Sequence, residues 1–335
     1  MKAVTLRKPP GIDSLDLVER EDPAAPGTGE IRVRVHASSL NYHDLAVVLG
    51  MLPTDDGRIP LSDGAGVVEA VGAGVTEFAV GDSVVSCFFP GWLSGEPTIP
   101  DFSKTPGDGV DGYARDAVVR PATWFTHAPK GYSHAEAATL TTAGLTAWRA
   151  LVVNGGLKAG DTVLVLGTGG VSIFALQFAK SMGATVITTS SSDEKIERAR
   201  SLGADHAVNY HRHKEWATQV LDLTNGRGVD HVLEVGGPDT LPQSIRACRL
   251  GGHIALIGVL TGFGGVIPTA TIMQRQQRVV GLIVGSRQHQ LDMVRGIDAT
   301  GIKPVIDRTF PLRDIRDSFR LLQSARHVGK ICVDI

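Results

Sequence analysis

The stretch Val163-Leu-Val-Leu-Gly-Thr-Gly-Gly-Val-Ser172 decides the fold of this chain. Its first four residues are apolar and predict a buried parallel strand, which ends at Gly167. Apolar residues at helical spacing follow, so a helix is expected to begin directly after Gly169 and Gly170. A strand, a glycine turn and a helix N-terminus form the arrangement that binds a pyrophosphate through backbone N–H groups. The stretch therefore predicts a dinucleotide site and hydride-transfer chemistry.

The sequence after this motif makes the prediction more specific, because a glycine fingerprint alone is weak and Ser172 stands at its third glycine position. Apolar runs separated by helix-length segments predict four more parallel strands, at 185–189, 206–210, 231–235 and 253–257. Strands that alternate with helices are typical of a doubly wound parallel sheet of the Rossmann type. The fold class is therefore predicted to be α/β.

Length and composition limit the remaining possibilities. A chain of 335 residues is longer than most single hydrophobic cores, so two domains are expected. The net charge is −2 and no long basic block occurs, which gives no indication of nucleic acid. The N-terminus lacks the apolar core of a signal peptide, and no apolar run approaches membrane-spanning length. Three widely separated cysteines favour a reduced, cytoplasmic protein.

The two ends of the chain have a different pattern from its middle. Short strands with glycine and proline turns are expected at 31–36, 64–72, 82–86 and 113–119, which indicates a small β-barrel, and 89–112 is expected to be a long loop. Ser133 and Glu136 fit a capping box at the start of a helix. The segments 303–310 and 330–335 again resemble barrel strands. We therefore predict a barrel domain from 1–125 and 300–335, a nucleotide domain from 126–299, and a substrate cleft between them.

These motifs together resemble the medium-chain dehydrogenase/reductase superfamily along essentially the whole chain. The resemblance rests on Asn41-Tyr-His-Asp44, Gly64-Ala-Gly-Val-Val-Glu-Ala-Val-Gly72, Gly81-Asp82, Thr141-Thr-Ala-Gly-Leu-Thr146, Gly167-Thr-Gly-Gly-Val171, Gly203-Ala-Asp205 and Gly329-Lys330. It implies a GroES-like barrel joined to a Rossmann domain. Within the superfamily the chain is similar to the zinc-free branch of quinone oxidoreductases and related alcohol-dehydrogenase-like proteins.

The positions that bind zinc in metal-dependent members of this superfamily carry other residues here. The resemblance places Asn41, Ser62 and Thr142 at these positions. None of them supplies the thiolate, imidazole or carboxylate that Zn²⁺ selects. The loop at 89–112 also lacks the four cysteines of a structural zinc lobe. His43, Asp44 and Asp63 could form only an unorthodox site, so we expect no metal.

The cofactor is expected to be NADP(H). The second parallel strand ends in hydroxyl side chains instead of the acidic residue that accepts from a ribose 2′-OH. Lys195 and Tyr210 match the spacing of NADPH-dependent quinone reductases, whereas Asp193 and Glu194 would repel a 2′-phosphate unless they only cap a helix. The motif and the resemblance together assign the cofactor to Tyr42, Thr142, Thr146, Gly167, Thr168, Gly169, Gly170, Val171, Ser190, Ser191, Lys195, Tyr210, Gly236, Gly258 and Val259.

The chemistry expected without a metal is reduction of an activated C=C bond in a quinone or an α,β-unsaturated carbonyl. No Lewis acid then stabilises an alkoxide, whereas an enolate needs only hydrogen-bond donors. Asn41 and His43 are the candidate catalytic residues, as a hydrogen-bond donor and a proton donor. A turn-forming role for Asn41 and a purely structural role for His43 are the alternatives. Asp44 is expected to fix the local backbone or to pair with a cation.

Small hydrophobic carbonyl compounds or quinones are the expected substrates. The resemblance also implies a homodimer that pairs edge strands of its nucleotide domains, and 278–284 is the candidate strand. An alcohol or carbonyl oxidoreductase on the same fold is the first alternative function. A non-catalytic nucleotide-binding protein is the second.

Overall fold

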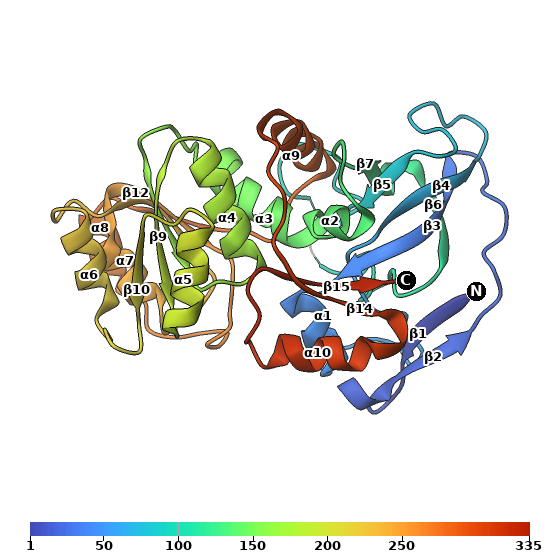
Figure 1. Cartoon of the computed structure of the whole chain (residues 1–335), viewed down its shortest axis with the longest axis horizontal. Coiled ribbons are helices and arrows are strands. Elements are labelled where there is room, and N and C mark those ends of the chain that lie inside the picture. Colours follow the sequence, from blue (N-terminus) through green and yellow to red (C-terminus); the bar gives the residue numbers. More distant parts are fainter. Residues whose placement is uncertain (99–100) are drawn as a thin grey trace. The chain divides into compact units, whose positions relative to one another are not determined.

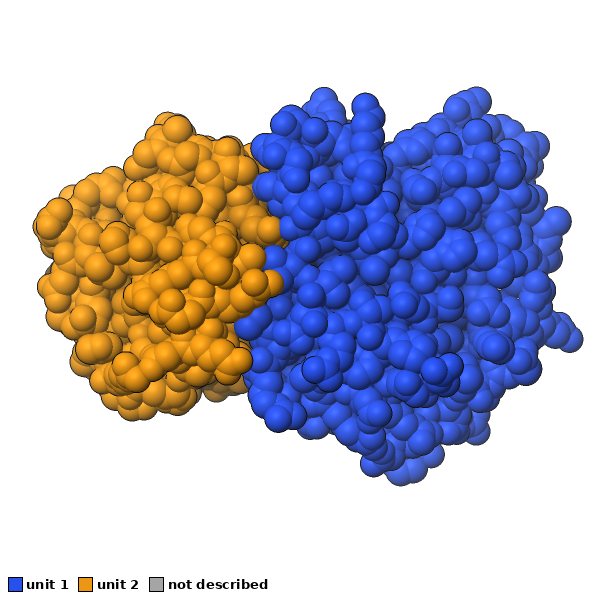
Figure 2. Space-filling view, viewed as in Figure 1, with its two compact units in different colours: residues 1–145, 284–335 blue, residues 146–283 orange. Residues whose placement is uncertain are grey.

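A computed structural model describes residues 1–98 and 101–335, so residues 99–100 of the expected loop at 89–112 lie outside the described residues. The chain divides into two compact units (Figure 2). Met1–Leu145 and Val284–Ile335 form unit 1, and Thr146–Ile283 form unit 2. Within the described residues, no helix is both long and apolar enough to cross a membrane.

Unit 2 is built on a six-stranded parallel sheet with the spatial order β10-β9-β8-β11-β12-β13. Its strands are β8 (Thr162–Leu166), β9 (Thr185–Ser190), β10 (His206–Asn209), β11 (Val229–Glu234), β12 (Cys248–Leu256) and β13 (Arg278–Gly281). The five parallel strands expected from the sequence are confirmed. The order reverses between β8 and β11, which is the switch point where the carboxyl ends of such sheets bind ligands. β13 forms one edge of the sheet.

Helices cover both faces of this sheet. They are α4 (Gly170–Ser181), α5 (Asp193–Ser201), α6 (Trp216–Leu223), α7 (Leu241–Ala247) and α8 (Thr269–Gln274). Figure 1 shows α4 and α5 on one face and α6, α7 and α8 on the other. The central strands are buried because side chains on both of their faces pack against helices, as in Leu164, Val232 and Ile254. This burial explains the nearly continuous apolar runs of the sequence.

Unit 1 contains a seven-stranded mixed sheet and a separate two-stranded hairpin. The hairpin pairs β1 (Lys2–Leu6) with β2 (Leu15–Glu19). The large sheet has the order β14-β15-β3-β4-β5-β7, and β6 also pairs with β3. Its strands are β3 (Glu30–Ser39), β4 (Ala65–Val71), β5 (Ser83–Ser86), β6 (Ala117–Pro121), β7 (Phe125–His127), β14 (Ile306–Pro311) and β15 (Lys330–Asp334). In β3, Ile31, Val33 and Val35 alternate into the core.

The C-terminal segment returns to this sheet as expected, because β15 pairs antiparallel with β3 and parallel with β14. The helices of unit 1 are α1 (Tyr42–Val48), α2 (His134–Ala138), α9 (Arg287–Thr300) and α10 (Ile315–Gln323), and α3 (Leu145–Trp148) spans the boundary with unit 2. The predicted capping box of α2 is present, with Glu136 N donating to Ser133 Oγ at 3.2 Å and Ser133 N donating to the Glu136 carboxylate at 2.7 Å.

Three boundaries differ from those expected. Unit 1 extends to residue 145 and resumes at 284, instead of ending at 125 and resuming at 300. The reason is that β7 pairs with β5, and that Gln290 of α9 donates to Ser86 O at 3.0 Å and to Thr126 Oγ1 at 2.8 Å. The strand expected at 113–119 begins at Ala117, because Tyr113 N donates to Leu61 O instead of to a sheet neighbour.

Candidate active site

The N-terminus of α4 faces open space at the carboxyl edge of the parallel sheet. Gly169 is its N-cap, with an extended backbone (φ −75°, ψ −179°) that any residue can adopt. A Cβ atom on Gly167 or Gly169 would meet nothing within 4 Å, so close packing does not require either glycine. Gly167 does need its left-handed backbone, at φ +74°. Open space and exposed amides at a helix N-terminus are what an anionic pyrophosphate requires.

The ends of the neighbouring strands continue this edge. Gly167 N donates to Thr189 O at 2.9 Å, and Tyr210 N donates to Ser190 O at 3.1 Å. The first turn of α5 follows β9, and Lys195 N donates to Ser192 Oγ at 3.4 Å, so Ser192 caps this helix. The residues expected to hold the ribose and its phosphate therefore lie at one edge of one sheet.

Glu234, which the sequence did not single out, organises the turn after β11. Its fully buried carboxylate accepts hydrogen bonds from Gly236 N at 2.8 Å, Gly237 N at 3.0 Å, Thr240 Oγ1 at 2.6 Å and Ser244 Oγ at 2.5 Å. The turn after β12 approaches closely, because a Cβ on Gly258 would lie 2.0 Å from Val235 O.

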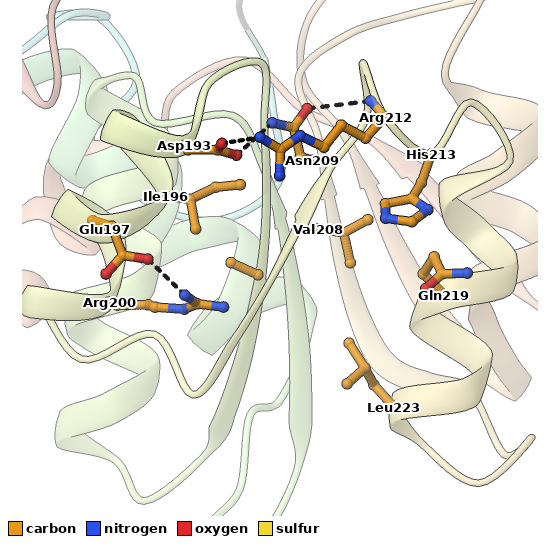
Figure 3. A pocket seen from close by; sticks show the side chains of 11 residues that line it. Asp193, Ile196, Glu197, Arg200, Val208, Asn209, Arg212, His213, Gln219 and Leu223 are labelled. Atoms are coloured by element: carbon orange, nitrogen blue, oxygen red, sulfur yellow. Dashed lines mark hydrogen bonds and ion pairs between the residues drawn. The ribbon is translucent and has the colours of Figure 1, made fainter.

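A groove of about 440 Å³ runs along the outer side of β10 between α5 and α6 (Figure 3). At the start of α5, the Asp193 carboxylate pairs with the Arg212 guanidinium and accepts a hydrogen bond from Asn209 Nδ2 at 2.9 Å. Further along α5, Glu197 pairs with Arg200 at 2.6 Å. The negative charge of Asp193, which would repel a phosphate, is therefore countered by Arg212.

In unit 1 the other candidate residues surround the N-terminus of α1. Asn41 is the N-cap, and Asp44 closes a capping box by accepting from Asn41 N at 2.8 Å. The second carboxylate oxygen of Asp44 accepts from Ser62 N at 2.8 Å. Asp44 thus fixes the local backbone, as expected.

A buried lysine lies beside Asn41 and Asp63, and these three side chains form a polar cluster in unit 1. Lys330 Nζ donates to Asn41 Oδ1 at 2.5 Å and to Leu40 O at 2.6 Å, and it lies 3.6 Å from Asp63 Oδ2. Asp63 also accepts from Ser39 Oγ at 2.5 Å and from Thr142 Oγ1 at 2.6 Å. Burial raises the pKa of the Asp63 carboxyl, and the Lys330 ammonium and these hydroxyls act against that rise. Lys330 was not predicted as a site residue.

This arrangement does not fit a zinc ion. The side-chain oxygen of Asn41 accepts from an ammonium group, and its nitrogen lies 3.2 Å from Asp44 Oδ2. The Thr142 hydroxyl is committed to Asp63, and Ser62 Oγ is buried without a hydrogen-bond partner. In the described part of the chain, no group of three or more His, Cys, Asp or Glu side chains is placed to hold a metal. A cation within 4 Å of Asp63 would further oppose a divalent ion.

His43, the candidate proton donor, lies on α1 beside an aromatic cluster. Its ring contacts Phe88 and Phe102, with centroids 5.2 and 4.8 Å away. Nε2 is buried and lies 3.4 Å from Asp108 Oδ2. Burial lowers the pKa of His43, and the Asp108 carboxylate opposes that effect.

The remaining site residues predicted from the sequence lie partly in unit 1 and partly in unit 2. Tyr42 is exposed at the first position of α1, and Thr142 belongs to the Asp63 network of unit 1. Thr146 is buried in α3. Unit 2 brings together, along the carboxyl edge of its sheet, Gly167, Thr168, Gly169, Gly170, Val171, Ser190, Ser191, Lys195, Tyr210, Gly236, Gly258 and Val259. Sequence reasoning missed Lys330, Asp108 and Glu234; only Lys330 had a signal, as a lone lysine that opens an apolar terminal strand.

Known proteins match this chain along its whole length. A family profile described as an alcohol dehydrogenase GroES-like domain matches residues 27–130, and one described as a zinc-binding dehydrogenase matches residues 170–298. A zinc-type alcohol dehydrogenase-like protein of Schizosaccharomyces pombe is 43% identical, over 97% of this chain and 96% of its own. The crystal structure of a candidate alcohol dehydrogenase from Sinorhizobium meliloti 1021 is 42% identical, with a TM-score of 0.92, and covers 100% of this chain and 98% of its own.

Structures of several activities share the fold. An NAD-dependent alcohol dehydrogenase is 34% identical with a TM-score of 0.90, and both chains are covered completely. A crotonyl-CoA carboxylase/reductase in complex with NADP is 25% identical with a TM-score of 0.88, over 100% of this chain and 94% of its own. A quinone oxidoreductase of Pseudomonas syringae pv. Tomato DC3000 is 28% identical with a TM-score of 0.83, over 100% and 99%. The GroES-like and Rossmann folds expected from the sequence are thereby confirmed.

Proposed function

Because the chain belongs to the medium-chain dehydrogenase/reductase superfamily of oxidoreductases, we propose that it is an NADPH-dependent reductase of quinones or α,β-unsaturated carbonyls that works without zinc. The observation that carries the proposal is the Lys330 ammonium, which occupies the polar cluster of Asn41 and Asp63. A fixed internal cation there leaves no set of anionic or imidazole ligands for Zn²⁺.

The residues at the carboxyl edge of unit 2 fit a dinucleotide. The amides at the start of α4 would hold the pyrophosphate, and the glycine turn before them leaves the space that it needs. Ser190, Ser191 and Lys195 would hold a ribose 2′-phosphate, with Tyr210 beside the adenosine. A nicotinamide cofactor bound there supplies the hydride.

Within unit 1, His43 is the proton source that we assign. Reduction at the β-carbon of an enone leaves an enolate, which must then be protonated. Asn41 is assigned a positioning role, because both ends of its amide already have partners in the cluster. This assignment revises the expectation that Asn41 donates to the substrate oxygen.

Two structural relatives support the substrate class, since one is a quinone oxidoreductase and another is a crotonyl-CoA carboxylase/reductase in complex with NADP. The resemblance to an NAD-dependent alcohol dehydrogenase supports a second candidate, an alcohol or carbonyl oxidoreductase. The two candidates differ in the bond that is reduced, C=C in the first and C=O in the second. We also propose a cytoplasmic homodimer that pairs its β13 strands, because β13 is a sheet edge.

The test is oxidation of NADPH by protein dialysed against EDTA, with menadione, cyclohexenone and cyclohexanone as acceptors and NADH in parallel. We expect turnover of menadione or cyclohexenone that survives EDTA and prefers NADPH. Activity that requires added zinc would overturn the metal-free proposal. Preference for cyclohexanone over cyclohexenone would favour the alcohol or carbonyl oxidoreductase instead.

A further inference from the structure

Asp108 lies in a tightly built loop of unit 1 that approaches α1. Asp108 N donates to Thr105 O at 3.3 Å, and Asp108 O accepts from Thr54 Oγ1 at 2.9 Å. Next to it, Gly107 has φ +85°, and a Cβ on this glycine would lie 2.8 Å from backbone atoms of Leu61. Only glycine satisfies both constraints, so the loop holds Asp108 in a fixed place.

The Asp108 side chain is buried beside His43. Among the described histidines, His43 is the one that pairs with Asp108. Only 9% of this side chain is exposed, compared with 13% of the His43 side chain. Their closest atoms, Asp108 Oδ2 and His43 Nε2, are 3.4 Å apart. Nε2 is buried and makes no hydrogen bond, so Asp108 acts on the ring through its charge. One ring nitrogen of His43 therefore lies next to a buried carboxylate.

The other residues around His43 and Asp108 include two aromatic rings and a few charged groups. Phe88 and Phe102 flank the ring and keep water from Nε2. The charge of Asp108 and, more weakly, that of Asp63 raise the pKa of His43. The charge of Arg58 lowers the pKa of Asp108, and that of Asp44 raises it. Asp108 is thus the carboxylate that best balances a positive charge on the ring.

From this geometry we propose that Asp108 is the positioning residue of His43: it orients the ring and stabilises the imidazolium from which the reduced substrate takes its proton. The proposal rests on the proposed function, because His43 is the proton donor assigned there. A buried carboxylate that orients a histidine and stabilises its charged form is a recurring arrangement in enzymes of unrelated folds.

The proton balance of the step is simple. The substrate accepts a hydride at its β-carbon from the nicotinamide cofactor, and the resulting enolate takes a proton from His43. The imidazole that remains is neutral and keeps its hydrogen on Nε2, the nitrogen that lies 3.4 Å from Asp108 Oδ2. Solvent then returns a proton to the imidazole. Asp108 stays ionised throughout and transfers no proton.

The first test measures the pKa of His43 in the cofactor-free protein, by NMR titration of protein labelled at histidine Cε1. The His43 signal is the one that disappears in His43→Gln. We expect Asp108→Asn to lower the pKa of His43 by about one unit, since an opposite charge within about 4–6 Å shifts a pKa by about one to three units. The matched control is Asp101→Asn, an exposed carboxylate in the same loop that accepts from Ser103 N. An unchanged pKa in Asp108→Asn would overturn the proposal.

The second test is the pH profile of enone reduction by the whole enzyme between pH 5.5 and 8.5. A proton donor loses activity as the pH rises through its pKa, so Asp108→Asn should move this loss to lower pH. At pH 7.5 we expect about a tenfold lower rate, with a smaller loss at pH 5.5, where more of the variant's His43 is protonated. Asp108→Glu should recover part of the rate. A loss that is equal at every pH would indicate a merely structural role and contradict the proposal.

A double-mutant cycle separates action through His43 from other effects. If Asp108 acts only through His43, then His43→Ala and His43→Ala/Asp108→Asn should reduce the enone at the same rate. A further tenfold loss in the double variant would overturn the proposal. Should the wild-type protein reduce neither acceptor, the proposed function fails, while the NMR titration still tests the coupling between the two side chains.

Discussion

The ammonium of Lys330 lies 2.5 Å from the side-chain oxygen of Asn41, and both side chains are buried. The contact joins the last strand of the chain, β15, to the N-terminus of α1. It also settles the orientation of the Asn41 amide, because an ammonium group can only donate and must face the oxygen. The amide nitrogen then faces Asp44, at 3.2 Å from Oδ2. One lysine thus determines the arrangement of the polar cluster of unit 1.

Removal of this cation should destabilise the protein strongly. Lys330→Met leaves Asp63 buried without its cation and leaves Leu40 O and Asn41 Oδ1 without a donor. Breaking a buried ion pair from one side costs about 3–5 kcal/mol, so the free energy of unfolding in urea should fall by about that amount. Lys130→Met, at an exposed lysine of the same unit, is the control and should change it by about 0.5 kcal/mol or less. Equal stability of the two variants would contradict the ion-pair assignment.

A serine at position 169 should separate cofactor binding from folding. The backbone of Gly169 is extended and its Cβ position is open, so Gly169→Ser should change the free energy of unfolding by about 0.5 kcal/mol or less. The new side chain would stand in the space before the α4 amides, and we expect the affinity for NADPH to fall by about tenfold or more, measured by fluorescence titration. Gly281→Ser is the control, since that exposed glycine also has an open Cβ position. Unchanged affinity in Gly169→Ser would place the cofactor elsewhere.

The parallel sheet was predictable because each of its strands carries a local signal. A buried strand such as 163–166 needs a run of apolar residues, and the glycines that follow it mark the turn. The capping box of Ser133 and Glu136 was predictable for the same reason, since both partners lie within one turn. Local sequence patterns of this kind predict most of the helices and strands of the two units.

The polar cluster could not be predicted from local patterns. Asn41, Asp63 and Lys330 come from three distant parts of the chain, and only the pairing of β15 with β3 brings them together. Asp108 lay in a segment that the sequence described only as a loop. The boundary at 145 was missed because the contacts that decide it, such as Thr141 Oγ1 to Ser86 O at 3.0 Å, link side chains and backbone far apart in sequence.

A buried histidine inside unit 2 should make its stability depend on pH. His253 on β12 is almost fully buried, neither of its ring nitrogens has a hydrogen-bond partner, and the His231 ring lies 5.7 Å away. Burial lowers the pKa of His253 to about 4, against an ordinary value of about 6.5. Between these values the unfolded chain binds a proton that the folded chain does not. Stability is therefore complete above about pH 6.5 and falls as the pH drops toward 4.

The expected loss is about 3 kcal/mol at pH 4, relative to pH 7, from His253 alone. His253→Leu keeps a similar volume without the titrating group. Between pH 7 and pH 4 the wild type should therefore lose about 3 kcal/mol more unfolding free energy than the variant. The measurement is urea unfolding at several pH values between 4 and 7.5. Parallel pH dependences of the two proteins would show that His253 is not the group responsible.

The ion pair between Arg212 and Asp193 should contribute to the choice between NADPH and NADH. Asp193 begins α5, three residues after Ser190, where a 2′-phosphate is expected, and Arg212 counters its charge (Figure 3). Arg212→Gln leaves this carboxylate with only its hydrogen bond from Asn209. We expect the affinity for NADPH to fall by about five- to tenfold and that for NADH by less than twofold, because only NADPH carries the additional phosphate charge. The difference should shrink in high salt, since both charged groups are exposed.

The control is Arg200→Gln, which removes the pair with Glu197 from the same groove and should leave both affinities unchanged. Equal losses for the two cofactors in Arg212→Gln would show that Arg212 supports the fold of this edge without selecting the phosphate.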